Sequence, residues 1–331
     1  MAFGRGDLPK PSAYGTSDGP LPESTPVSKP IPSTATTQRT AWILLLLTCL
    51  FWSGNVVASR SAVGELSPMA LVTIRWGLVS VVMLAVAWRS FLRDLPVLLA
   101  HWLPVTLMGL CGFTAYQALY FGAAHATTGV NLAILQGVAP VFVFAGARIF
   151  YKTPIGLVRG TGLLLTLLGI AVVATRGHVL SLASIELNGG DAAMLLASSL
   201  YAAYTVALRQ RPPVSSLSFF TALSIVATLT SLPLFGWEVA SGALQWPTTK
   251  GWVVLAYVVI FPSLLAQVFF IRGVEMIGPG RASLFYNLVP VIGAIMAVTL
   301  LGEPFALYHA AGLMLAIGGI ALAEIWGRRK A

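Results

Sequence analysis

The chain has 331 residues, of which 57% are hydrophobic and only 9% are charged, and its mean hydropathy is +0.84. A soluble globular protein carries about 25% charged residues, so this chain cannot cover its surface with polar groups. The composition therefore predicts an integral membrane protein. The net charge of +9 would favour nucleic-acid binding in a soluble protein, but here its distribution across the membrane has to be considered first.

The two ends of the chain differ in composition from the rest. Residues 1–38 are rich in Pro, Ser and Thr, and three basic residues balance three acidic ones. This composition predicts a disordered cytoplasmic tail, and the lack of an apolar stretch within it argues against a signal peptide. Residues 327–331 predict a short basic cytoplasmic C-terminus.

Between these ends, apolar runs follow one another with short polar breaks. A membrane-spanning helix needs about 20 mostly apolar residues. The predicted fold class is an all-α integral membrane protein with ten transmembrane helices. The runs lie at 41–59, 68–88, 103–123, 128–149, 156–175, 190–209, 216–236, 252–272, 282–301 and 305–325.

Basic residues at the ends of these runs predict the orientation. If the N-terminus is cytoplasmic, 13 Lys and Arg lie at inside ends, and only Arg60, Arg176 and Lys250 lie outside. The positive-inside rule then places both termini in the cytoplasm, which also agrees with an even number of spans. This bias accounts for the basic charge without nucleic acid. We expect a multi-pass protein of the cell inner membrane.

A repeat with an offset of 150 residues divides the chain into two halves. Between 137–173 and 287–323, eleven of 37 positions are identical, including Pro140 with Pro290. The halves are predicted at 39–176 and 190–326, with five helices each. Because five is odd, the second half must enter the membrane with opposite polarity. Inverted repeats of this kind are typical of secondary transporters, which bind substrate between the halves.

Several motifs together resemble a known family. These are "FWSGNVVASR" in the first run, "SPMALVTIRW" at the start of the second, "VAPV" and "LVPV" in the paired late runs, and the ending "LLGEP…GLMLAIGGIAL". In this order they resemble the EamA branch of the drug/metabolite transporter superfamily, over about residues 40–326. The resemblance implies transport of small molecules without ATP, often efflux of amino acids, metabolites or drugs. One departure is Thr153, which occupies the place that Glu303 has in the second half.

Polar and aromatic side chains within the runs are the candidate substrate-binding residues. Amides that face lipid are costly, so these side chains should point into the bundle. They predict a neutral cavity for amphipathic or zwitterionic solutes, with hydrogen bonding between helices as the alternative. The candidates are Trp52, Asn55, Tyr116, Gln117, Tyr120, Gln136, Tyr204, Gln267, Tyr286 and Asn287, with Ser59, Asn131 and Tyr201 on the same helices.

Arg75 is the single charge placed well inside a predicted span and is also a candidate. It could bind a substrate carboxylate or steady a gate. It could equally extend toward the interface or pair with Glu65.

Prolines and glycines supply candidates for helix geometry. Pro140 and Pro290 each remove a backbone hydrogen bond near the start of a span, which predicts helix kinks beside a substrate site or kinks that packing tolerates. Five glycines predict close helix packing or a dimer surface, so a homodimer is left open. They are Gly156, Gly160, Gly312, Gly318 and Gly319.

The remaining features narrow the function class. No Asp or Glu lies near the middle of a predicted span, so exchange or facilitated diffusion is at least as plausible as proton coupling. His125 and Glu275 align across the repeat at helix ends, and loop roles are expected for both. Cys49 and Cys111 lie in apolar runs and predict neither a disulfide nor a metal site.

The expected function is a secondary transporter, exporting small organic solutes by alternating access. A channel is the first alternative and a membrane enzyme the second. The enzyme is disfavoured because the four histidines are scattered and no phosphate-binding Walker loop occurs. The expected partners are a small-molecule substrate and the lipid bilayer, without nucleic acid, cofactor or metal.

Overall fold

The fold is taken from a computed structural model, which describes residues 35–152, 156–175, 177, 188–277, 282 and 285–322. The predicted basic C-terminus and Thr153 lie outside the described residues, as does most of the predicted tail. The first helix begins at Ala35, before the predicted end of the tail at residue 38.

Every regular element among the described residues is helical, as the apolar runs predict. A helical segment lies within each of the predicted ranges. The segments are α1 (Ala35–Ala62), α2 (Pro68–Ala100), α3 (Trp102–Gly109), η1 (Leu110–Ala115), α4 (Tyr116–Ala123), α5 (Gly129–Gln136), α6 (Ala139–Tyr151), α7 (Leu157–Ala174), α8 (Gly189–Ala207), η3 (Leu208–Gln210), α9 (Ser216–Ala240), α10 (Thr249–Val258), η4 (Val259–Leu265), α11 (Ala266–Ile277), α13 (Leu288–Leu301) and α14 (Leu307–Ala321).

Length and hydropathy agree with a membrane protein. Within the described residues, 6 helices are long and apolar enough to cross a membrane. Shorter apolar helices occupy Gly160–Val173, Leu288–Leu301 and Leu307–Ala321. The count of ten spans stays a prediction.

Two spans contain a π-helical turn at corresponding places in the repeat. η1 joins α3 to α4, and η4 joins α10 to α11, about 150 residues later. Pro262 lies inside η4 and has no backbone N–H to donate, which explains the irregular turn there. π-helical turns inside α-helices are frequent at functional sites.

The two repeated prolines lie where helices begin. The chain leaves the helical path at Gly137 and Val138 and resumes it at Ala139, so Pro140 occupies the first turn of α6. A proline costs little in a first turn, because the missing N–H would have no partner within the helix. Pro290 is the third residue of α13. Both prolines thus follow a short interruption of the helix, and neither bends a continuous helix.

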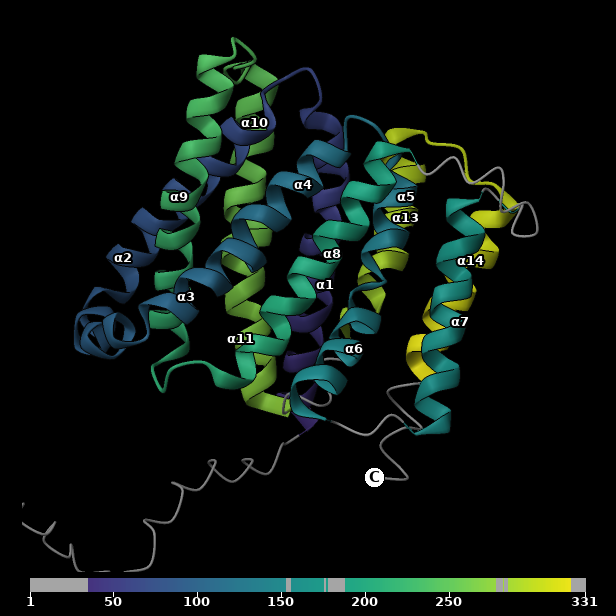
Figure 1. The fold of residues 1–331 in the computed structure, drawn as a ribbon, viewed down its shortest axis with the longest axis horizontal. Helices are drawn as coiled ribbons and strands as arrows, with labels where there is room; N and C mark the ends of the chain where they lie inside the picture. Colours follow the sequence, from purple (N-terminus) through teal and green to yellow (C-terminus); the bar gives the residue numbers. More distant parts are fainter. Residues whose placement is uncertain are drawn as a thin grey trace, which may run out of the picture.

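The helices form an extended bundle (Figure 1). The pair α2 and α9 lies at one side of the bundle and the pair α7 and α14 at the opposite side, with α1, α4, α5, α8, α11 and α13 between them. The packing follows the repeat: α4 packs on α8 as α11 packs on α1, and α6 packs on α8 as α13 packs on α1. Helices of the two halves therefore interlock across the centre.

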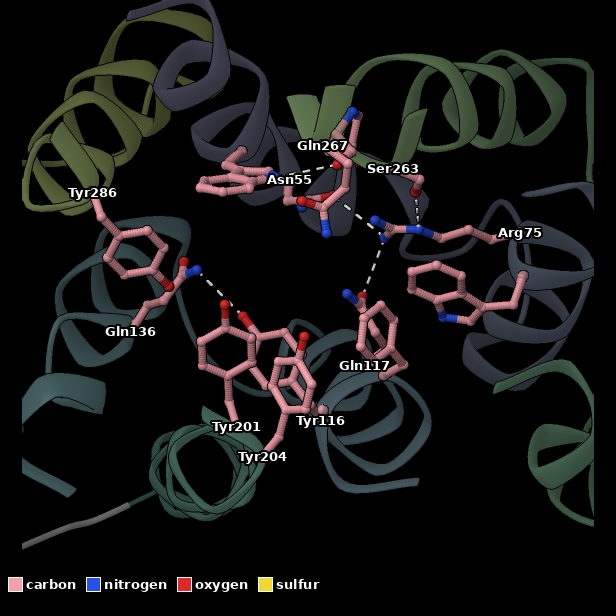
Figure 2. A pocket seen from close by; sticks show the side chains of 15 residues that line it. Asn55, Arg75, Tyr116, Gln117, Gln136, Tyr201, Tyr204, Ser263, Gln267 and Tyr286 are labelled. Carbon is pink, nitrogen blue, oxygen red and sulfur yellow. Dashed lines mark hydrogen bonds between the residues drawn. The ribbon is translucent and has the colours of Figure 1, made fainter. Parts of the chain in front are cut away.

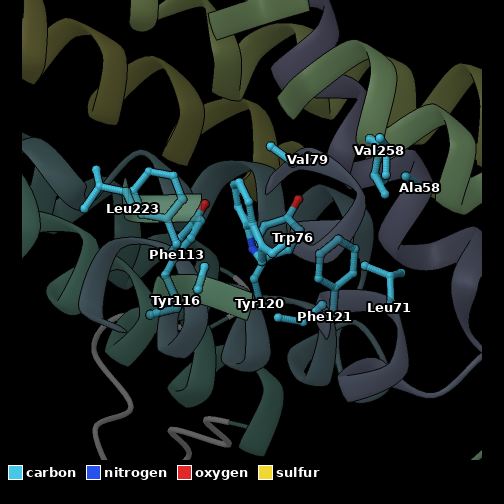
Figure 3. Packing of buried hydrophobic residues seen from close by; sticks show 14 of the residues in the cluster. Ala58, Leu71, Trp76, Val79, Phe113, Tyr116, Tyr120, Phe121, Leu223 and Val258 are labelled. Atoms are coloured by element: carbon cyan, nitrogen blue, oxygen red, sulfur yellow. The ribbon is translucent and has the colours of Figure 1, made fainter. Parts of the chain in front are cut away.

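A large apolar core fills the space between α2, α4, α8, α9 and α10. Figure 3 shows Trp76 and Phe113 at its centre, with Phe121 and Leu223 around them. The rings of Trp76 and Phe113 lie 4.9 Å apart in an edge-to-face arrangement, which is favourable for aromatic pairs.

Glycines bring α7 and α14 into backbone contact. A Cβ on Gly169 would lie 2.5 Å from the carbonyl oxygen of Gly312, and a Cβ on Gly319 would lie 2.4 Å from that of Gly162. Of the five glycines that the sequence singles out, Gly312 and Gly319 make this contact. At Gly156, Gly160 and Gly318 an added Cβ would meet nothing within 4 Å, so they make no close packing within the described chain, and a dimer surface there stays a prediction.

Two acidic side chains hold helix N-termini across the repeat. Glu238 of α9 accepts hydrogen bonds from the backbone N–H of Met69 at 3.0 Å and of Ala70 at 3.1 Å, at the start of α2. Asp94 of α2 accepts one from the backbone N–H of Ser215 at 3.0 Å, at the start of α9. Carboxylates satisfy the free N–H groups of a helix start and complement its dipole, so each helix of this pair stabilises the other.

Candidate functional site

A cavity lies at the centre of the bundle and contains about 590 Å³ of empty space, including its opening. Helices of both halves contribute to its wall. The lining residues are Trp52 and Asn55 of α1, Arg75 and Trp76 of α2, Gly112 and Phe113 of η1, Tyr116 and Gln117 of α4, Gln136 of α5, Tyr201 and Tyr204 of α8, Pro262 and Ser263 of η4, Gln267 of α11, and Tyr286. The part of this space that a water-sized sphere can occupy is about 80 Å³, which is below the usual volume of small-molecule sites, about 300–1,000 Å³.

Most of the sequence-predicted site residues meet in this cavity. Trp52, Asn55, Arg75, Tyr116, Gln117, Gln136, Tyr204, Gln267 and Tyr286 all line it. Two candidates do not belong to the lining. Tyr120 is buried beside Tyr116 and Phe121, and Asn287 is the N-cap residue of α13. Ser59 and Asn131 also lie elsewhere, with Asn131 donating to Asp191 at 3.3 Å.

Arg75 carries the charge of the cavity. Its side chain is 2% exposed. Nε donates to Ser263 Oγ at 2.8 Å, and Nη1 donates to Gln117 Oε1 at 3.1 Å and to Asn55 Oδ1 at 3.5 Å. The suggested pairing with Glu65 is wrong, because Glu65 pairs with Lys250 Nζ at 3.2 Å.

The π-helical turns shape the wall beside Arg75. In η4, Ser263 Oγ donates to the carbonyl oxygen of Val258 five residues earlier, at 2.6 Å, and accepts from Arg75. In η1, Gly112 lets Tyr204 approach closely, since a Cβ on Gly112 would lie 2.4 Å from the Tyr204 ring. Each irregular turn thus fixes one side chain of the cavity.

A continuous aromatic wall faces this polar group. Ring centroids of Tyr116 and Tyr201 lie 5.1 Å apart, those of Tyr201 and Tyr204 5.6 Å, and those of Tyr204 and Phe113 5.4 Å. Figure 2 shows Arg75, Gln117 and Ser263 on one side of the cavity and the Tyr201 ring on the other.

Hydrogen bonds from the side chains of Gln136 and Trp52 fix further parts of the cavity lining. Gln136 Nε2 donates to the Tyr116 hydroxyl at 3.2 Å, which ties α5 to α4 (Figure 2). Trp52 Nε1 donates to the carbonyl oxygen of Pro262 at 3.2 Å, and its ring lies 5.7 Å from that of Tyr286. The Trp52 bond satisfies a carbonyl within the π-helical turn, as an apolar surrounding requires.

Sequence reasoning missed several lining residues. Trp76, Phe113 and Gly112 look like ordinary packing residues in a run of apolar letters, and Ser263 is a single small polar residue. Pro262 was the available signal, because a proline inside an apolar run indicates an irregular backbone. Tyr201 was recognised only as a neighbour of Tyr204.

A second polar cluster lies where α1 ends and α2 begins, which the charge pattern predicts to be the outer end. Glu303 pairs with Arg60 Nε at 3.3 Å and accepts from the backbone N–H groups of Gly129 and Val130, both at 2.9 Å. Burial and the nearby Arg60 guanidinium hold the pKa of His125 below its usual range. The two halves are therefore joined by a charged contact at this end.

Comparison with known proteins identifies the family. The EamA-like transporter family matches residues 39–175 and again residues 188–324. The uncharacterized transporter YyaM of Bacillus subtilis is 25% identical over 292 residues, which cover 86% of this chain and 93% of the relative. An uncharacterized transporter of Archaeoglobus fulgidus is 26% identical, with 84% and 96% covered. A chloroplastic WAT1-related protein of Arabidopsis thaliana is 26% identical, with 85% and 68% covered.

A solved crystal structure has the same fold. It superimposes with a TM-score of 0.62 at 19% identity and covers 88% of this chain and 99% of its own. The double family match, the helices long enough to cross a membrane and the relatives named as transporters agree with one another. The chain is a membrane transporter and belongs to the EamA-like transporter family.

Proposed function

We propose that the chain is a secondary transporter that moves small organic solutes by alternating access, with the central cavity as its substrate site. The observation that carries this proposal is the cavity itself, which both halves line with polar and aromatic side chains. Secondary transporters built from repeats bind substrate at this place, near the middle of the membrane and between the halves.

The symmetry of the α7–α14 contact supports inverted repeats. Gly162 meets Gly319 and Gly169 meets Gly312, so the two helices run antiparallel. The repeat equates Gly162 with Gly312 and Gly169 with Gly319, so each contact is the copy of the other. A twofold axis that relates antiparallel helices in this way lies perpendicular to them, within the membrane plane. Ten spans in two halves of opposite polarity have this relation.

The contact at the predicted outer end supports a state in which the cavity is closed on that side. At the predicted outer end, Glu303 joins Arg60 and the start of α5. The alternating cycle then requires the Arg60–Glu303 contact to open. The family resemblance favours export as the direction of net transport.

The test is uptake by purified protein in proteoliposomes, with a panel of amino acids, organic anions and amphipathic cations. The proposal expects saturable uptake of at least one class, faster than in protein-free liposomes. Imposing a pH gradient separates proton coupling from exchange or facilitated diffusion, and unchanged uptake is expected because no carboxylate lines the cavity in the described structure. Unitary currents in planar bilayers would instead establish a channel.

A further inference from the structure

The cavity has a chemical polarity that narrows the substrate class. We propose that the carrier takes organic monoanions, with a carboxylate bound at Arg75 and an apolar or aromatic body against the tyrosine wall. This inference rests on the proposed transport function, because it names the solute for that same cavity.

The first step is the charge balance of the cavity. Arginine remains protonated in proteins, and the side chain of Arg75 is 2% exposed. Its hydrogen-bond partners Ser263, Gln117 and Asn55 are all neutral. No Asp or Glu belongs to the described lining, and the ion pairs of the described residues do not include Arg75. A buried charge without a counter-ion is costly, so the cavity favours an anion.

The second step is the orientation of the guanidinium group. Its hydrogen bonds to described residues use Nε and Nη1, from three different helical segments. The Trp76 ring centroid lies 5.3 Å from Cζ and that of Phe121 lies 5.9 Å from it. These contacts hold the group without neutralising it, and the hydrogen bonds to described residues do not use Nη2. A guanidinium held in this way suits the planar geometry of a carboxylate.

The third step is the body of the solute. Tyr116, Tyr201 and Tyr204 form an aromatic surface opposite Arg75 (Figure 2), and the contact between Trp52 and Tyr286, one residue from each half, extends it. Aromatic rings favour offset or edge-to-face contact with another ring. A cation would meet Arg75 without a carboxylate to receive it, so amphipathic cations are disfavoured. The cavity thus separates an anionic head from an apolar body.

The experiment compares three probes of one shape on the wild-type protein in lipid nanodiscs. They are 3-phenylpropanoate, 3-phenylpropanamide and 3-phenylpropylamine, which are anionic, neutral and cationic at neutral pH. Binding is followed by intrinsic fluorescence, because Trp52 and Trp76 line the cavity. The carboxylate should bind about tenfold or more tightly than the amide, and the amine should bind most weakly.

Arg75→Gln removes the proposed anchor and should abolish the preference for the carboxylate, with amide binding unchanged. Arg89→Gln is the matched control, since it removes one positive charge from the same helix at an exposed position. It should keep the preference. If Arg75→Gln yields no monodisperse protein, the three probes on the wild type decide on their own.

The outcomes separate this inference from the proposed function. Equal or tighter binding of the amide or amine, a preference retained in Arg75→Gln, or no carboxylate binding at millimolar concentration would overturn the inference. Saturable transport of another solute class that Arg75→Gln leaves unchanged would also reject it and keep the carrier. Carboxylate binding that depends on Arg75, without flux in proteoliposomes, would support the anion site and reject the carrier.

Discussion

The central cavity and the α7–α14 contact are built in opposite ways. At the cavity, large polar and aromatic side chains leave open space, and a buried charge has only neutral partners. At the α7–α14 contact, glycines leave no space, and one backbone lies against the other. In a membrane, close packing and not hydrophobic burial drives helix association, so small residues give the firmest contacts.

The difference teaches which substitutions should affect which property. A changed side chain in the cavity should alter transport and leave the fold intact. An added atom at the α7–α14 contact should weaken the fold, and transport should fall only as a consequence.

The largest effect is expected for Gly319→Ala. The new Cβ would lie 2.4 Å from the Gly162 carbonyl oxygen and 2.5 Å from Thr166 Oγ1, so the helices must separate. Overpacking of this kind costs typically 1–3 kcal/mol of unfolding free energy. The melting temperature in detergent should fall clearly. Gly318→Ala is the neighbouring control and should leave it unchanged, because nothing lies within 4 Å there. Equal melting of the two variants would contradict the contact.

Glu303→Gln tests whether the Arg60–Glu303 contact at the predicted outer end is a gate that opens during transport or a contact that only stabilises the fold. The variant loses the ion pair to Arg60 and weakens two backbone hydrogen bonds, each of which is worth about 1.5–3 kcal/mol when charged. If the contact is a gate, transport should change more than the melting temperature. Arg60→Gln should have the same effect on transport, and the double variant should add little to it. Additive effects would show that the two residues act separately.

Gln117→Ala should reduce transport about tenfold without loss of folded protein, because Gln117 Oε1 accepts from Arg75 and orients it. Gln267→Ala should have a smaller effect, since Gln267 lines the same cavity at the matching position of the repeat. The measurement is the initial rate of uptake at equal amounts of reconstituted protein. Wild-type rates in both variants would remove the paired glutamines from the site.

Gly112→Ala should lower transport a few-fold. Its Cβ would overlap the Tyr204 ring and displace it from the aromatic wall. Gly122→Ala lies further along the same span, has open space at this position, and is the matched control. Uptake rates and melting temperatures of the two variants are compared. If the uptake rate of Gly112→Ala equals that of the control, the observed position of the Tyr204 ring is not required for transport.

The smallest effect is expected at Glu65, outside the spans. A hydrogen bond from Thr248 and one from Lys250 lower the pKa of this carboxyl below its usual range. The ionised form therefore stabilises the folded protein above the unfolded pKa of about 4.3, and this contribution is lost as the pH falls through the lower folded pKa. Glu65→Gln should have a slightly lower melting temperature than the wild type at neutral pH, and the difference should shrink as the pH falls below about 4.3. A constant difference across this range would contradict the linkage.

Sequence patterns predicted the apolar helices and nine of the residues that line the cavity, because apolar runs and isolated polar residues within them are visible from residue type. Gln117 and Gln267 are conspicuous in apolar runs, and so is Arg75. The hydrogen bond between Arg75 and Ser263 could not be predicted from the sequence, because Ser263 meets Arg75 only when η4 departs from regular helix.

Glycine positions show the same limit. Gly318 and Gly319 are adjacent residues of the same type, yet only Gly319 faces α7. Which face of a helix packs is set by the surrounding helices. The caps that Glu238 and Asp94 provide also depend on pairs that lie far apart in the sequence.

The most direct test of the central claim is counterflow in proteoliposomes, with a solute that the uptake panel identifies. Liposomes are loaded with unlabelled solute and diluted into a trace of labelled solute. An alternating-access carrier should accumulate the label transiently above its equilibrium level, and Gln117→Ala should reduce the peak. Uptake that rises only to equilibrium, whatever the internal load, would contradict alternating access and indicate a channel.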